Sequence, residues 1–280
     1  MIEAAAQRWK RITGSPSTDV NLAEGALLIA AEAYEHLDVD AYLRKIDEMG
    51  ATLRRRLRSD ISTSEALLAL NRYVFDELGF SGNAAHYYDP RNSYLNEVID
   101  RRLGIPITLA VLYIEIGRRI GLPLHGVSFP AHFLVKCVLR EGSIIIDPYA
   151  RGASLGVGDL QERLKGVARG VELDDALMSS LLAAAEPREI LARMLRNLRA
   201  IHLRQGEKLR ALAASSRIVE LVPGAAEEYR DRGELYAELE CARAAVADLR
   251  QYLKLKPQAS DSEHVARRVA ELENLAARLN

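Results

Sequence analysis

Apolar residues recur at the spacing of an α-helix through the first eighty residues of the chain. Asp38 suits the N-cap of a helix that begins near Val39, because its side chain can accept a hydrogen bond from the first turn. A further amphipathic run follows Ser62 or Ser64, either of which suits an N-cap, and stops at Gly79. We therefore predict a helical N-terminal region over these residues.

The pattern changes after the turn signal at Asp89. A short helix is expected from Tyr94 to Leu103, ended by Gly104. Pro106 suits the first turn of the next helix, where its missing N–H costs nothing. That helix is apolar nearly all round, which predicts a buried central helix.

Short β-rich runs follow at residues 124–129, 132–139 and 143–147, with a turn at 140–142 between the last two. Residues 151–170 are rich in glycine and are expected to be an irregular loop. Helices followed by strands indicate an α+β fold, in which a small antiparallel sheet packs against the central helix. We place this core at residues 81–170, after the helical region 1–80.

The last hundred residues are helical again and contain an internal repeat. The runs 217–223 and 251–257 are 34 residues apart, which is the period of tetratricopeptide repeats. Gly233 stands where that pattern needs a small residue, whereas an earlier, weaker copy has Arg199 there and His202 in place of a tyrosine. Residues 186–280 are therefore predicted to be an all-α, tetratricopeptide-like region.

Composition narrows the functional classes. A formal net charge of -1 gives no overall field to attract nucleic acid. The two cysteines are far apart and form no zinc-ligand pattern, so neither a disulfide framework nor a structural metal is expected. The N-terminus lacks a signal-peptide core, and no apolar run is long enough to cross a membrane. We expect a cytoplasmic protein without a cofactor or a membrane partner.

One pair of residues carries candidate chemistry. His132 heads one predicted strand, and Asp147 ends the next. Antiparallel pairing around the turn between them places the two side chains roughly opposite each other. A carboxylate beside an imidazole fixes its tautomer, as a base and its orienting partner require. The same pair can equally be a satisfied polar contact without activity.

Residues 22–150 resemble the SirB family of transglutaminase-like proteins, whose members often carry tetratricopeptide-like repeats. The resemblance is carried by the stretches EGALLIA, YYDPRNSYLNEVIDRRLGIPITLAVLY, GLPLHGVSFPAHFLVKC and IIDPYARG. It implies a transglutaminase-like core in which His132 matches the histidine and Asp147 the aspartate of the active proteins. The turn at 121–123 matches the one that follows their central helix.

The resemblance also implies that the nucleophile is missing. In active members a cysteine begins the central helix, and Pro106, or at most Ile107 or Thr108, occupies that place in this chain. Thr108 is a weak substitute without a demonstrated base. Cys137 lies five residues beyond His132 and faces the other side of its strand, so both it and Cys241 are expected to be packing residues.

A polar set precedes the central helix and could line a cleft beside His132. Arginine there could clamp a carboxylate or a peptide terminus; the other interpretation is a local network that pins the loop. The candidate binding residues are Asn92, Asn96, Arg101, Arg102 and Thr108. Tyr87 and Tyr88 are expected to be hydrophobic anchors whose hydroxyls reach solvent. A metal held by His86, His125, His132 and Asp147 has no supporting motif.

These observations favour a non-catalytic protein that binds a protein or peptide partner through a remnant cleft and helical repeats. The alternative is a hydrolase or an amide- or acyl-transfer enzyme that uses His132 as base and Asp147 as its orienting partner. A regulator of gene expression, suggested by the naming of the family, is a third interpretation. The near-neutral charge argues against direct contact with DNA.

Overall fold

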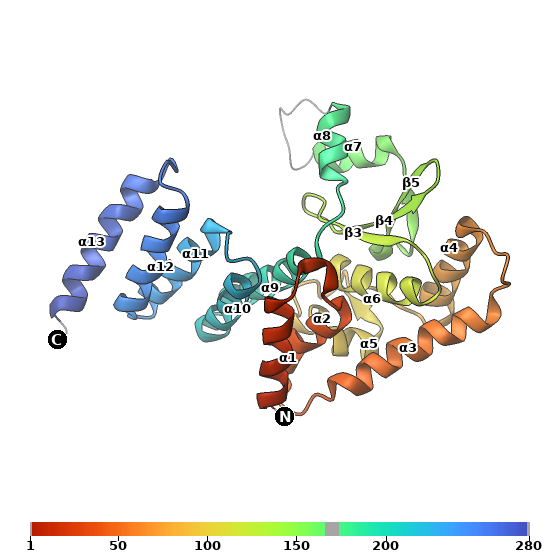
Figure 1. Ribbon diagram of the computed structural model, residues 1–280, viewed down its shortest axis with the longest axis horizontal. Coiled ribbons are helices and arrows are strands. Elements are labelled where there is room, and N and C mark those ends of the chain that lie inside the picture. The colour runs from red at the N-terminus through yellow and green to blue at the C-terminus, as the bar shows by residue number, and fades with distance from the viewer. Residues whose placement is uncertain (1, 166–173, 279–280) are drawn as a thin grey trace. The chain divides into compact units, whose positions relative to one another are not determined.

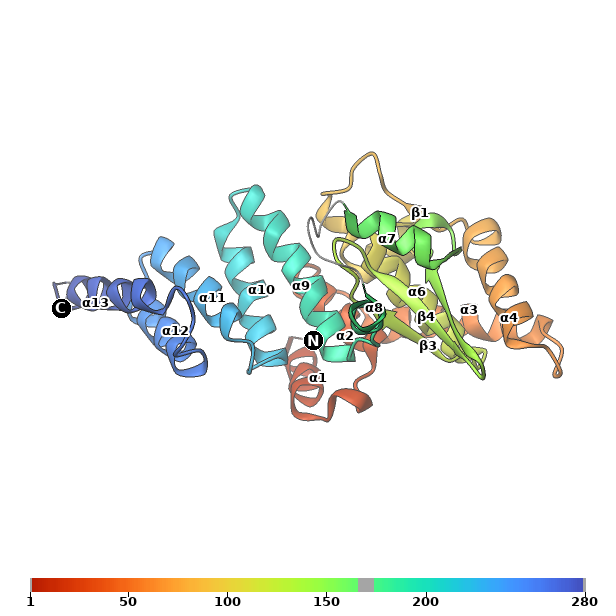
Figure 2. The same cartoon turned by 90° about the horizontal axis from the view of Figure 1, so that it is seen from above.

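Figures 1 and 2 show a computed structural model of the chain, which describes residues 2–165 and 174–278. The chain divides into two units, Met1–Ile190 and Leu191–Asn280. The first combines helices with a small antiparallel sheet and the second is helical, which confirms the predicted fold class. The further division of the first unit at residue 80 stays a prediction.

Helices form the N-terminal region where the apolar spacing predicts them. The Asp38 side chain accepts a hydrogen bond from the Ala41 N–H and begins a helix at Val39, as expected. Ser62 forms a reciprocal capping box with Glu65. The elements are α1 (Ile2–Gly14), η1 (Ser17–Asp19), α2 (Leu22–Ala31), α3 (Val39–Arg56), α4 (Thr63–Asn71) and the π-helical turn η2 (Arg72–Glu77).

The next helix ends earlier than predicted. After η3 (Pro90–Asn92), α5 spans Leu95–Arg101, and Arg102 closes it in the left-handed conformation with φ 62° and ψ 18°. Gly104 is not the helix end, because β2 (Leu103–Gly104) pairs in parallel with β1 (Ser81–Gly82). This pairing takes Leu103 and Gly104 out of the helix.

The central helix is α6 (Pro106–Arg119), and it is buried from Pro106 to Gly117, as predicted. It packs against α3 and against the strands β3 and β4 (Figures 1 and 2). A Cβ atom at Gly117 would lie 2.3 Å from Leu124 Cδ1, so the close approach of helix and sheet requires glycine there.

The sheet has four antiparallel strands in the order β3-β4-β5-β6. They are β3 (Leu124–Val127), β4 (Leu134–Leu139), β5 (Gly142–Asp147) and β6 (Ala153–Leu155). The predicted turn joins β4 to β5, and Val135 pairs with Ile146. Apolar residues of the sheet, including Leu134 and Ile145, form one cluster with Leu160 and Leu164 of the following helix.

The prediction that residues 151–170 form an irregular loop is wrong for the part that the structure describes. The turn η4 (Pro148–Ala150) comes just before the stretch, which then contains β6 and the helix α7 (Val157–Lys165). Leu160 and Leu164 are one helical turn apart and both buried, which stabilises α7 against the sheet. Residues 166–170 lie outside the described residues; α8 (Asp175–Leu181) follows.

The second unit repeats a pair of helices. Its elements are the end of α9 (Pro187–Arg204), α10 (Lys208–Leu221), α11 (Ala226–Glu238), α12 (Ala242–Leu255) and α13 (Ser262–Arg278). Helix α12 begins and ends 34 residues after α10, which is the predicted period. Ala245, Leu249 and Tyr252 form its core together with Val265 and Leu272.

Candidate functional site

The His132 side chain meets the Asp147 carboxylate where β4 begins and β5 ends. His132 lies in a turn just before β4, where its backbone N–H donates to the Phe129 carbonyl at 3.2 Å. Asp147 is the last residue of β5. The antiparallel pairing of the strands brings His132 Nε2 to 2.9 Å from Asp147 Oδ1. The two side chains therefore lie together as the strand pattern implies, while their functional role stays a prediction.

The Asp147 carboxylate has partners at both oxygens. Oδ1 also accepts hydrogen bonds from the N–H groups of Tyr149 (3.0 Å) and Ala150 (3.2 Å), which cap η4. Oδ2 lies 2.7 Å from Nη2 of Arg163 on α7. Burial raises the pKa of Asp147, but the contacts from His132, Arg163 and the Ala150 N–H outweigh it and leave the pKa below its usual range.

These contacts fix the tautomer of His132. An ionised Asp147 only accepts hydrogen bonds, so in the neutral ring this contact requires the proton on Nε2. The His132 side chain is 16% exposed, whereas that of Asp147 is 1% exposed. The pair thus combines a partly exposed imidazole with a buried carboxylate.

The start of α6 carries no cysteine. Pro106 is the first helical residue. The buried Thr108 hydroxyl accepts from the Ile105 N–H at 3.1 Å and donates to the Asn92 carbonyl at 2.7 Å. It holds the helix start and the preceding loop together, so its hydrogen bonds are used within the fold.

The cysteines lie away from this pair. Cys137 is fully buried in β4 opposite Ile144, and burial raises the pKa of its thiol. It is a packing residue, as expected. Cys241 is exposed and precedes the first residue of α12, so the prediction that it packs inside a repeat helix is wrong. It sits at the helix entrance, where the side chain is left in solvent.

Asn92 pins the loop that runs from Asn83 to the start of α5. Its side-chain oxygen accepts from Asn83 Nδ2 at 3.1 Å, and its amide donates to the His86 and Tyr87 carbonyls at 2.7 and 3.3 Å. Asn92 is fully buried. The structure therefore gives Asn92 and Thr108 partners inside the protein, and a binding role for them stays a prediction.

This loop places Tyr87 and Tyr88 near the His132–Asp147 pair, where they meet Tyr149 of η4. The Tyr149 ring lies edge-on to the His132 ring at 6.1 Å, and Tyr87 lies 6.4 Å from Tyr149. Tyr87 and Tyr88 are 38% and 57% exposed, so Tyr88 in particular is more exposed than a hydrophobic anchor with a hydroxyl in solvent would be. Together with the half-buried Tyr149 they form an aromatic surface next to the pair, which we call the tyrosine surface (Tyr87, Tyr88 and Tyr149).

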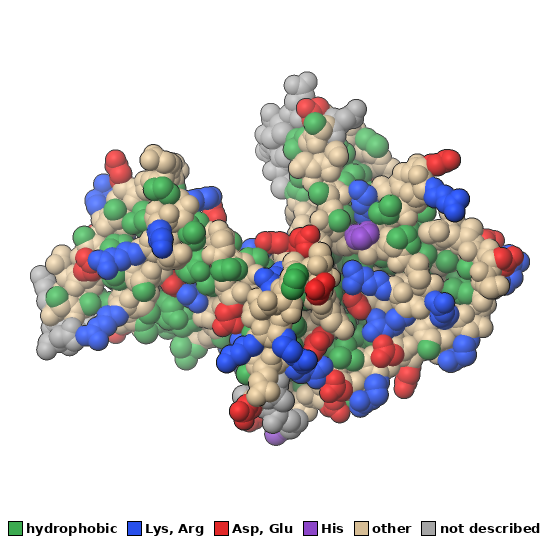
Figure 3. All heavy atoms as spheres, viewed as in Figure 1, with side chains coloured by type: hydrophobic (Ala, Val, Ile, Leu, Met, Phe, Trp, Pro, Cys, Tyr) green, Lys and Arg blue, Asp and Glu red, His purple; other side chains and the backbone are tan. Residues whose placement is uncertain are grey.

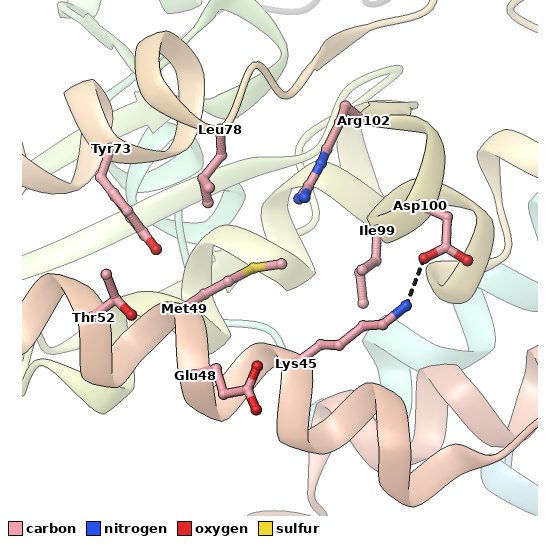
Figure 4. Close-up of a pocket in the computed structure, with 9 residues that line it drawn as sticks. All are labelled: Lys45, Glu48, Met49, Thr52, Tyr73, Leu78, Ile99, Asp100 and Arg102. Carbon is pink, nitrogen blue, oxygen red and sulfur yellow. Dashed lines mark hydrogen bonds and ion pairs between the residues drawn. The ribbon is translucent and has the colours of Figure 1, made fainter.

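The other predicted binding residues lie elsewhere. Asn96 is buried in α5, and Arg101 Nη2 lies 3.6 Å from Asp89. Arg102 lines a separate pocket between α3 and α5 (Figure 4). The described partners of the Asp147 carboxylate are His132, Arg163 and two backbone N–H groups, and none of the three predicted residues is among them.

Sequence reasoning missed Arg163 and Tyr149. Arg163 lies in the segment expected to be a loop, although Leu160 and Leu164 around it have helical spacing. That spacing was the available signal. Tyr149 packs over Gly82, where a Cβ atom would lie 2.4 Å from its ring. No local sequence pattern predicts this contact, because it joins residues far apart in sequence.

The described part of the chain holds no group of three His, Cys, Asp or Glu side chains placed to bind a metal ion. His86 and His125 thus do not join His132 and Asp147 in such a group. On the face shown in Figure 3, acidic and basic side chains are interspersed. No helix among residues 2–165 and 174–278 is both long and apolar enough to cross a membrane.

Comparisons with known proteins place the chain in a family. A model of the transglutaminase-like superfamily matches residues 40–196, and a tetratricopeptide repeat model matches residues 198–270. A UPF0162 protein of Xylella fastidiosa is 39% identical over 95% of both chains. Protein SirB1 of Salmonella typhimurium is 26% identical over 79% of this chain and 81% of its own.

A segment of a much longer animal protein is also similar. Human F-box only protein 21 is 35% identical over 51% of this chain, which corresponds to 23% of its own length. Taken with the two family models, the sequence stretches and the fold, these matches show that the chain belongs to the transglutaminase-like superfamily, as a SirB-like protein with tetratricopeptide repeats.

Proposed function

We propose that this chain is a non-catalytic protein that binds a peptide or protein partner on a transglutaminase-like fold without a cysteine nucleophile. One observation carries the proposal: α6 begins with Pro106, and the Thr108 hydroxyl is held between Ile105 and Asn92. Proline has no nucleophilic atom, and Thr108 is fully buried. An acyl-enzyme has no starting atom at this end of α6.

The tyrosine surface is the proposed binding surface. Tyrosine side chains offer a large contact area at a low entropic cost, together with a polar group. Tyr88 is more than half exposed, and the His132 ring lies beside Tyr149. A partner could pack on the rings and accept or donate a hydrogen bond at His132.

The repeats support a protein rather than a nucleic acid or a membrane as the partner, since tetratricopeptide repeats generally mediate contacts between proteins. A net charge of -1 points the same way. In F-box only protein 21 the similar segment is one part of a longer chain, which fits a module that works with other parts. We propose a cytoplasmic location.

The test is a peptide selection on the purified full-length protein, followed by fluorescence polarisation with the enriched peptide. Tyr88→Ala should weaken binding by about tenfold or more, as the loss of an aromatic hot spot does. Leu68→Ala is the matched control, because Leu68 is a similarly exposed apolar side chain on α4. No enriched peptide, or equal losses in both variants, would contradict the proposal.

A second function is favoured by the 2.9 Å contact between His132 and the ionised Asp147. That pair could act as a general base on water or on a substrate amine, in a hydrolase or amide-transfer reaction without a covalent intermediate. His132 Nδ1 would take a proton from the attacking group, and the buried carboxylate would stabilise the resulting imidazolium.

Hydrolysis of activated esters and of glutamine-containing peptides separates the two functions. An enzyme would lose about a hundredfold or more of its rate in His132→Ala. The matched control is His125→Ala, since His125 is exposed on β3 outside the site. A well-folded wild type without activity above the His132→Ala background leaves the binding function in place.

A further inference from the structure

A pocket of about 380 Å³ lies between α3, the end of η2 and the C-terminal end of α5 (Figure 4). It is distinct from the His132–Asp147 pair in the elements that form it. Its apolar part comes from Met49, Leu78 and Ile99, with Tyr73 at one side. A volume of this size is at the small end of ligand sites in proteins.

The Arg102 side chain points into this pocket (Figure 4). Its guanidinium carbon lies 4.6 Å from the centre of the buried Phe80 ring, so one face of the cation is covered. Nη1 is buried without a hydrogen-bond acceptor among the described residues. An unpaired buried N–H of a cation is costly, and an anion bound elsewhere on the guanidinium would offset part of that cost.

The acidic group on the same helix is already occupied. Asp100 accepts a hydrogen bond from Lys45 Nζ at 2.8 Å and another from the Tyr42 hydroxyl. Burial raises the pKa of Asp100, but the bonds from Lys45 and Tyr42 and the charges of Lys45 and Arg102 lower it below its usual range. Arg102 itself forms no ion pair within the described part of the chain. The guanidinium is therefore the cation of this pocket that lacks a matched anion.

The backbone of Arg102 points to the same conclusion. Its left-handed conformation is unusual for a residue other than glycine or asparagine. The conformation is held by the Arg102 N–H on the Val98 carbonyl and by the Ser81 N–H on the Arg102 carbonyl, both at 2.9 Å. The conformation ends α5 and sets the direction of the Arg102 side chain, which points into the pocket.

We propose that this pocket binds a small carboxylate with a short aliphatic tail. The carboxylate would pair with the fork of Arg102, and the tail would lie among Met49, Leu78 and Ile99. Free branched-chain acids and apolar α-amino acids both carry this chemistry. Glu48 is exposed at the pocket rim and could pair with an ammonium group. If the natural ligand is an amino acid, it would therefore bind more tightly than the acid that lacks the amino group.

Met49 provides a direct reporter. The sequence has four methionines, so ¹³C-methyl labelling gives few signals, and only Met49 lines this pocket. The full-length protein is titrated with 4-methylpentanoate, L-leucine, neutral 4-methylpentanamide and inorganic phosphate. We expect a saturable shift of the Met49 signal with one or both carboxylates, and unchanged signals from Met178 and Met194.

Arg102→Gln should weaken this binding by about tenfold or more, the usual loss for a charged hydrogen bond. Arg44→Gln, which removes an exposed guanidinium from the same helix as Met49 but outside the pocket, should bind as the wild type does. If Arg102→Gln unfolds, Thr52→Trp fills the pocket from α3 and leaves the guanidinium in place.

The outcomes divide cleanly. Carboxylate binding that is lost in Arg102→Gln, or in Thr52→Trp where Arg102→Gln does not fold, with no shift from the amide, supports the proposal. The proposal is overturned by the absence of any saturable Met49 shift, by equal binding of the amide, or by phosphate binding as tightly as the aliphatic acids. Retained affinity in a folded Arg102→Gln would also overturn it.

Discussion

At the scale of single residues, Asp147 has a structural role besides its contact with His132. It caps η4 through two backbone N–H groups, and it binds Arg163 of α7. A buried carboxylate with these partners joins strand, turn and helix, so the fold needs it whether or not His132 acts on a substrate. The presence of the pair alone is therefore no argument for catalysis.

This role predicts a pH-dependent cost for Asp147→Asn. Removing one partner of a buried ionic contact should lower the free energy of unfolding by about 3 kcal/mol at pH 7. The pKa of Asp147 is lowered in the folded state, so its contribution is fully present above the unfolded value of about 3.9 and is lost as the pH falls from there through the lowered folded value. Urea denaturation from pH 7 to pH 3 should show the gap between wild type and variant closing.

Glu162→Gln is the control for this prediction. Glu162 is on the same helix as Arg163, but its carboxylate is mostly exposed and pairs only with Lys165 in the described structure. Exposed pairs contribute little, so this variant should follow the wild type closely at every pH. A constant gap between Asp147→Asn and the wild type down to pH 3 would show that Asp147 does not ionise with a lowered pKa.

The sequence predicted His132 and Asp147 as neighbours because strand alternation and one short turn fix their relation. Arg163 could not be placed the same way, since its contact depends on where α7 packs on the sheet. Asn92 and Thr108 were candidate binding residues because they are polar and lie close to the start of the central helix, but the sequence does not show that both are buried. A polar residue near a helix start looks the same in sequence whether it faces a ligand or a backbone carbonyl.

At the scale of elements, helices with clear caps were the most predictable. Asp38 and Ser62 begin their helices where expected. The errors came from tertiary pairing: β2 draws the chain out of α5 before Gly104, and β6 forms only because β5 offers an open edge. Ser81 pairs with Leu103, which is too far along the chain to leave a local pattern, whereas β6 is near β5 in sequence but too short to show a strand alternation.

The repeat helices approach each other through Gly233. A Cβ atom there would lie 2.9 Å from Leu249 Cγ and Cδ2, while α11 and α12 form the main contact of the repeat. Alanine at this position would gain helix propensity and lose packing, with a small net effect. A larger side chain must push the helices apart.

We therefore expect Gly233→Val to lower the free energy of unfolding of the repeats by about 1–3 kcal/mol, the usual cost of overpacking. Gly224→Val is the control, because a Cβ atom at Gly224 meets no atom within 4 Å. Urea denaturation followed by circular dichroism measures both. Equal stability of the two variants would mean that α11 and α12 are not packed as closely as the structure has them.

At the scale of the whole molecule, each unit has a core of its own. The first buries α6 against the sheet and the N-terminal helices, and the second buries Ala245, Leu249 and Tyr252 with α13. The two family models divide the chain at residues 196–198, close to the division at residues 190 and 191. Separate cores predict two unfolding transitions rather than one.

The single tryptophan makes this prediction testable. Trp9 is buried in α1 of the first unit, so its fluorescence reports that unit, whereas circular dichroism reports helices of both. Leu249→Ala removes a fully buried side chain and should destabilise the repeats by about 3 kcal/mol. Part of the helical signal should then melt earlier, while the midpoint seen by Trp9 stays unchanged.

Leu27→Ala is the matched variant in the first unit, since Leu27 is equally buried in α2, which packs against α1. It should shift the Trp9 midpoint and leave the repeat transition in place. If either variant moves both transitions together, the two cores unfold as one, and binding at the repeats would then stabilise the transglutaminase-like core as well. If they move separately, a partner held by the repeats leaves the stability of the His132–Asp147 pair unaltered, and each surface can be tested by its own substitutions.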